Sequence, residues 1–143
     1  MRQRVILDDR LLVETLLGGG TTRSAPALHT TSYWYHRACR AAVAGAGGHL
    51  SDPFAQVSDE HQARATMSLL QLTDDIGLPD PRSTVPLMAD LARAHPRLNL
   101  LNLEAAAAAI TLEATVWLSP EAARGILPAV LDAEHLPWEV RET

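Results

Sequence analysis

The sequence contains few of the residues that typify an exported protein or a sulfur-bound metal site. Cys39 is the only cysteine among 143 residues, which excludes an internal disulfide and a paired-cysteine metal clip. We expect Cys39 to be a buried apolar side chain. No apolar run approaches the roughly 20 residues of a membrane span, and the one before Asp8 is too short for a signal peptide. These absences predict a cytoplasmic protein with no membrane contact.

Aromatic residues make up only 4% of the chain, and lysine is absent. A core with few aromatic residues must be built from Leu, Val, Ile and Ala, which favours helices packed on a small sheet. The triplet Gly18–Gly20 lacks the lysine of a phosphate-binding loop, so we expect it to end a helix. The net charge of −5 argues against binding nucleic acid through bulk electrostatics. Any phosphate contact would need a local basic patch.

Short apolar segments alternate with helical patterns along the chain. Strands are predicted at 5–7, 76–78, 115–118 and 136–140. Helices are predicted at 9–17, 30–44, 58–70, 83–94 and 102–113, with a last one restarting at 119–121 and reaching about 133; residues 21–27 are expected to form a loop. This alternation implies parallel connections. We therefore predict an α/β fold with a small parallel sheet of about four or five strands flanked by helices, in a single domain over 1–143.

Two acidic residues are placed where a parallel sheet gathers ligands. Asp8 follows the first strand, and ligands bind beyond the carboxyl ends of such strands. Glu104 opens a later helix and could approach the same edge, where two acids can hold Mg²⁺ or Mn²⁺. The simpler interpretation makes Asp8 the N-cap of the first helix and Glu104 a solvent-facing acid of a first turn. Both interpretations stay open.

Five segments together resemble the PIN-domain family, which includes ribonuclease toxins of the VapC type. These segments are 5–8 (VILD), 31–42, 102–106 (NLEAA), 115–118 (TVWL) and 135–140 (HLPWEV). The resemblance implies a three-layer PIN-like fold. It also implies three or four carboxylates that hold a divalent metal and activate water against an RNA phosphate, and an antitoxin-like protein as partner.

The resemblance carries over to the acidic positions only in part. Asp8 matches the first acid and Glu104 the third, but the second position falls on Arg37 or, with one residue of slippage, on His36. For the fourth acid only a shifted Glu121 is present. The resemblance therefore implies a degenerate active site with no cofactor, in which Arg37 pairs with Asp8 or Glu104 in place of a metal ion.

The helix predicted at 30–44 carries a polar stripe at helical spacing, formed by Tyr33, His36, Arg37 and Arg40. One interpretation is a small patch that binds a phosphate or stacks a base. The other is an exposed helix face that happens to carry two arginines. A run of alanines, Ala105–Ala109, allows close approach to the sheet or to a second subunit in a homodimer.

Three functions are compatible with these observations. The preferred one is a PIN-like domain with an incomplete acidic site that binds RNA or a protein partner. The second is an active Mg²⁺- or Mn²⁺-dependent endoribonuclease of toxin type. Its metal ligands would be Asp8 and Glu104 with Asp9, Asp80 or Glu121 completing the shell. The third is a purely structural interaction subunit.

Overall fold

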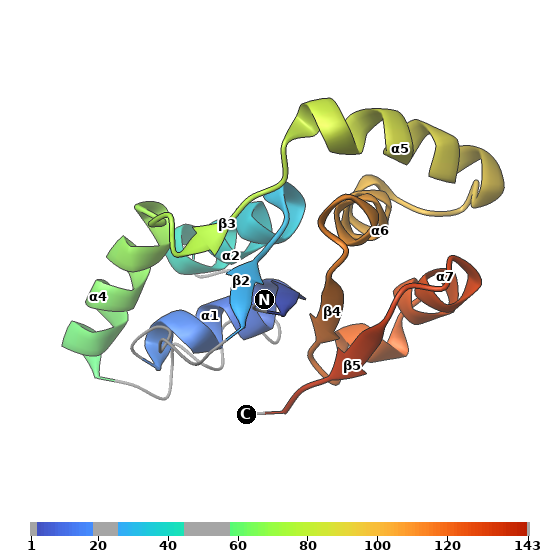
Figure 1. Ribbon diagram of the computed structural model, residues 1–143. Helices are drawn as coiled ribbons and strands as arrows, with labels where there is room; N and C mark the ends of the chain where they lie inside the picture. Colours follow the sequence, from blue (N-terminus) through green and yellow to red (C-terminus); the bar gives the residue numbers. More distant parts are fainter. Residues whose placement is uncertain (1–2, 19–25, 45–57, 143) are drawn as a thin grey trace.

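Five parallel strands form the centre of the computed structural model, which describes residues 3–18, 26–44 and 58–142 (Figure 1). The strand order is β3-β2-β1-β4-β5. The strands are β1 (Arg4–Leu7), β2 (Ala27–His29), β3 (Ile76–Gly77), β4 (Thr115–Leu118) and β5 (Trp138–Val140). Because β1 is central and β2 and β4 lie on either side of it, the strand order reverses there. The predicted α/β class with a small parallel sheet is confirmed.

The strands alternate with helices that cover both faces of the sheet. The helices are α1 (Asp9–Leu17), α2 (Ser32–Ala44), α4 (Asp59–Leu70), α5 (Pro81–Ala94), α6 (Leu100–Leu112), the 3-10 turn η1 (Ala122–Arg124) and α7 (Leu127–Ala133). None of the helices in the described segments is long and apolar enough to cross a membrane.

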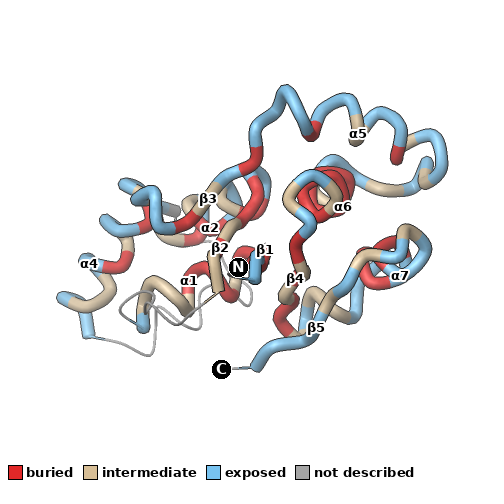
Figure 2. Tube along the Cα trace, in the orientation of Figure 1, coloured by how far each residue is buried: buried red, intermediate tan, exposed pale blue. Residues whose placement is uncertain are grey.

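The alternation of side chains along β1 explains the three layers. Val5 and Leu7 point to one face and pack against α1, α2 and α4, whereas Ile6 points to the other face and packs against α6. All three are almost fully buried. The most deeply buried helix is α6 (Figure 2), in which Ala105–Ala109 are at most 1% exposed. These alanines belong to the chain's own core, so they offer no surface to a second subunit.

Several element boundaries differ from the prediction. Strand β2 was not predicted, because only one of its three residues, Leu28, is both apolar and buried. Its extended conformation is stabilised by pairing with β1 on one side and with β3 on the other. Helix α6 begins at Leu100, not at Asn102, because the side chain of Asn99 caps its first turn. Gly18 ends α1 as predicted; Gly19 and Gly20 lie outside the described residues.

A close contact joins β2 to the edge strand β3. His29 is paired in register with Gly77, and a Cβ atom at Gly77 would lie 2.4 Å from Nδ1 of His29. The glycine therefore makes room for the imidazole ring. Within the described part of the chain, the buried Nδ1 atom has no hydrogen-bond partner. Burial lowers the pKa of His29, and the charge of Arg4 lowers it further.

We expect His29 to make the fold acid-sensitive. Because its folded-state pKa lies below the unfolded value of about 6.5, the unfolded chain binds more protons between the two values. Stability should therefore fall as the pH drops below about 6.5 and level off below the folded-state pKa. His29→Leu should remove this part of the loss, as measured by urea unfolding at a pH of about 7.5 and about 5. Equal losses in the variant and in the wild type would contradict this assignment.

Candidate functional site at the carboxyl edge of the sheet

A polar cleft lies beyond the carboxyl ends of the central strands, where the strand order reverses. Its volume is about 290 Å³. Polar lining comes from α1, α2, the start of α6 and the segment after β4, through Asp9, Arg37, Asn99, Asn102 and Glu121. Apolar side chains such as those of Trp34 and Leu127 also line the cleft. The cleft thus combines one guanidinium, two carboxylates and two amides.

Asp8 lies at the turn from β1 into α1 and is fully buried. Its Oδ1 accepts a hydrogen bond from the backbone N–H of Leu11 at 2.9 Å, so Asp8 is the N-cap of α1. Its Oδ2 accepts hydrogen bonds from the backbone N–H of Ser119 at 2.8 Å and from its Oγ at 2.7 Å. Burial raises the pKa of Asp8, and these hydrogen bonds oppose the rise. Through these hydrogen bonds, the side chain of Asp8 connects the junction of β1 and α1 to the residue that follows β4.

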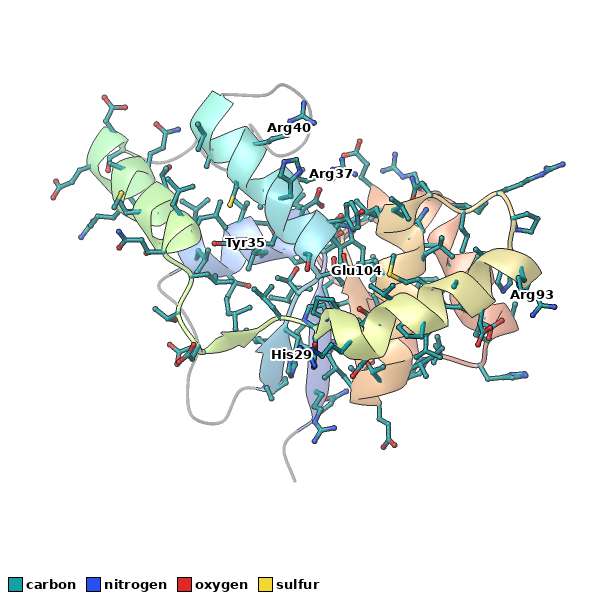
Figure 3. The ribbon with its side chains drawn as sticks, turned by 90° about the horizontal axis from the view of Figure 1, so that it is seen from above. His29, Tyr35, Arg37, Arg40, Arg93 and Glu104 are labelled. Carbon is teal, nitrogen blue, oxygen red and sulfur yellow. The ribbon has the colours of Figure 1, made fainter. Side chains whose placement is uncertain are left out.

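Glu104 caps a helix other than its own. It is 4% exposed, and its Oε2 and Oε1 accept hydrogen bonds from the backbone N–H groups of Ser32 at 3.0 Å and Tyr33 at 2.9 Å. These are the first N–H groups of α2, which have no acceptor within the helix. Figure 3 shows Glu104 at this end of α2. Since α6 begins at Leu100, Glu104 lies in its second turn, and the predicted solvent-facing first-turn acid is wrong.

Arg37 forms its ion pair with an acid other than the two predicted. Its Nε lies 3.1 Å from Oδ2 of Asp9, and the Asp9 side chain is 4% exposed while that of Arg37 is 48% exposed. The predicted pairing with Asp8 or Glu104 is therefore corrected to Asp9. The physical reason is that Asp8 and Glu104 are already supplied with donors by the backbone, whereas Asp9, the first residue of α1, faces α2 across the cleft.

The other residues of the predicted stripe share the exposed side of α2. Tyr33, His36, Arg37 and Arg40 are all exposed, and Arg37 and Arg40 project from the same side of the helix in Figure 3. Arg37 lines the cleft, and Arg40 lies one turn further along α2. A role in binding phosphate or stacking bases stays a prediction.

The remaining candidate ligands do not complete a metal shell. Asp80 caps α5 through its Oδ1, which accepts a hydrogen bond from the backbone N–H of Arg82 at 3.0 Å, and it does not line the cleft. Glu121 lines the cleft but is exposed. Over residues 3–18, 26–44 and 58–142, no group of three or more His, Cys, Asp or Glu side chains is arranged to share a metal ion. The described residues therefore do not fit the divalent metal that the PIN resemblance implies.

Ser119 is the residue of the site that the sequence did not reveal. It lies 111 positions from Asp8 and contributes both a backbone and a side-chain donor to that carboxylate. In the sequence, Ser119 before Pro120 and Glu121 was only a helix-start signal. Its position directly after a strand parallel to β1 is the feature that brings it beside Asp8.

Comparison with known proteins supports the fold. A chain in the structure of VapBC-1 from nontypeable Haemophilus influenzae superposes with a TM-score of 0.53, covering 96% of this chain and 98% of that chain at 12% sequence identity. No protein-family model matches the sequence, and no curated protein matches it. The likeness extends over nearly the whole chain and shows a PIN-like three-layer fold.

Glu104→Gln tests the inter-helix cap. The glutamine can present its carbonyl oxygen to only one of the two N–H groups and turns a donor toward the other, so we expect a loss of about 1–3 kcal/mol in the free energy of unfolding. Glu113→Gln is the matched control, since Glu113 is an exposed acid at the end of the same helix. The control should change stability by less than about 0.5 kcal/mol. Equal effects would show that the loss of charge, and not of the cap, matters.

Proposed function

We propose that this chain is a PIN-like domain that acts by binding, and not as a metal-dependent nuclease. One observation carries the proposal: all four carboxylate oxygens of Asp8 and Glu104 accept hydrogen bonds from the protein. A hydrolytic metal centre would need these oxygens to face a shared ion and the substrate phosphate. Here they are buried and hold helices in place.

Recruiting these acids to a metal would be costly. Turning Asp8 toward the cleft would leave the start of α1 without its cap, and turning Glu104 would leave the first two N–H groups of α2 without an acceptor. The loss of such a cap typically costs about 0.5–2 kcal/mol. The buried Ser119 hydroxyl, which donates to Asp8, would also lose its acceptor. The observed hydrogen bonds therefore favour a structural role for both acids.

The surroundings of the cleft favour a protein as the binding partner over RNA. The chain has a net charge of −5, and within the cleft the Asp9 and Glu121 carboxylates outnumber the Arg37 guanidinium. Exposed apolar side chains border it: Ile126, 48% exposed, lines the cleft, and Leu100, 55% exposed, precedes the lining residue Leu101. Apolar groups around a few polar ones are typical of protein interfaces. An antitoxin-like protein is the class that the resemblance to VapC-type toxins implies.

Calorimetric titration with Mn²⁺, together with incubation with a mixed RNA pool, tests the absence of hydrolysis. We expect no saturable heat of Mn²⁺ binding and no RNA cleavage that requires the metal. Asp8→Asn is the comparison variant, with circular dichroism to verify that it folds. Metal-dependent cleavage by the wild type that disappears in Asp8→Asn would replace the binding function with the endoribonuclease.

Fluorescence anisotropy with labelled single-stranded RNA distinguishes the two kinds of partner. We expect weak binding that is abolished by raising the salt concentration, because few arginines face the cleft and the chain is acidic overall. Tight, metal-independent binding that is lost in Arg37→Ala and Arg40→Ala would identify RNA as the ligand, with the stripe on α2 as its site.

A further inference from the structure

The carboxylate of Asp9 is nearly buried and lies beside a positive charge. Its side chain is 4% exposed, and a carboxylate removed from water is strongly destabilised unless donors or a cation replace the water. The backbone N–H of Arg10 donates to Oδ1 at 2.9 Å. Nε of Arg37 lies 3.1 Å from Oδ2. The guanidinium, which reaches the cleft from α2, provides the charge that faces this acid across the cleft.

The position of Nε in Arg37 also indicates where a glutamate at position 37 would place its carboxylate oxygens. In arginine, Nε is bonded to Cδ; in glutamate, the carboxylate oxygens are bonded to Cδ. A glutamate at this position in the same rotamer would therefore place an oxygen near the present Nε, 3.1 Å from Oδ2 of Asp9. Two oxygens on neighbouring corners of an octahedral Mg²⁺ shell, with bonds of about 2.1 Å at right angles, lie about 3 Å apart. The two separations agree.

We propose that Arg37 is the built-in cation of the cleft, and that a single charge reversal at this position would convert the cleft into a divalent-metal site. This inference deepens the proposed function, on which it rests, because it adds the charge of Arg37 beside Asp9 to the hydrogen-bonded oxygens of Asp8 and Glu104 as a reason for the absence of a metal site. Further oxygen donors line the same cleft, namely the side-chain amide of Asn102 and the carboxylate of Glu121. Both are ligand types that Mg²⁺ and Mn²⁺ accept.

Three variants of the full chain test the inference, with MnCl₂ as the probe in calorimetry and in thermal unfolding. Arg37→Glu adds the carboxylate, Arg37→Gln keeps the shape of that side chain without its charge, and Arg40→Glu makes the same charge reversal one exposed turn away on α2. We expect Arg37→Glu to melt at a lower temperature than the wild type without metal, to be restabilised by Mn²⁺, and to bind Mn²⁺ at least about tenfold more tightly than Arg40→Glu. Arg37→Gln should show no metal response.

The outcomes separate this inference from the proposed function. If the wild type itself binds Mn²⁺ and cleaves RNA, the proposed function fails. If the wild type does neither and Arg37→Glu binds Mn²⁺ no better than Arg40→Glu, only the inference fails.

A second measurement applies if Arg37→Glu does not fold. Arg37→Gln and Asp9→Asn form a double-mutant cycle, in which the combined variant should lose less stability than the sum of the single variants, because the two side chains form one ion pair. Strict additivity would show that Arg37 does not neutralise Asp9 and would overturn the inference.

Discussion

The carboxyl edge of the sheet depends on how three nearly buried carboxylates are stabilised without water. Removing a carboxylate from water costs several kcal/mol, and only hydrogen-bond donors or a cation recover that cost. Asp8 meets this demand with donors from α1 and the end of β4, whereas Glu104 and Asp9 both use groups of α2, namely its first N–H groups and Arg37. The same contacts therefore hold the elements together, and they occupy all four carboxylate oxygens of Asp8 and Glu104.

The sequence was sufficient to predict the elements that depend on residues close together in the chain. Residues Val5–Leu7 followed by two acids predicted a buried strand and then a helix from Asp9, and both are present. Of the two interpretations of Asp8, the N-cap is confirmed. The sequence was insufficient to predict contacts between residues that lie far apart in the chain. The partners of Glu104 lie 72 and 71 positions earlier in the chain, and nothing in the segment 102–106 distinguishes an acid that faces solvent from one that faces the end of another helix.

Arg37 is a second case in which the sequence predicted a feature but not the distant residue involved. Its position in the resemblance predicted an ion pair with an acid at this edge, and the ion pair exists, but with Asp9. Three acids meet within one region, and spacing along the chain does not reveal which of them already has donors. Leu11, Ser119, Ser32 and Tyr33 donate to Asp8 and Glu104, whereas the guanidinium of Arg37 lies beside Oδ2 of Asp9.

The use of Asp8 and Glu104 as acceptors for helix N–H groups gives these two acids a role in the fold that needs no metal ion. In a site that depends on a metal, clustered carboxylates repel one another until a cation binds, so the acids oppose folding in its absence. Here Asp8 and Glu104 accept hydrogen bonds from the starts of two helices, and Asp9 forms an ion pair with an arginine, so each acid has a partner within the chain. A structural role is therefore enough to account for Asp8 and Glu104. Their presence is therefore weak support for catalysis, and the residue at position 37 is the more informative one.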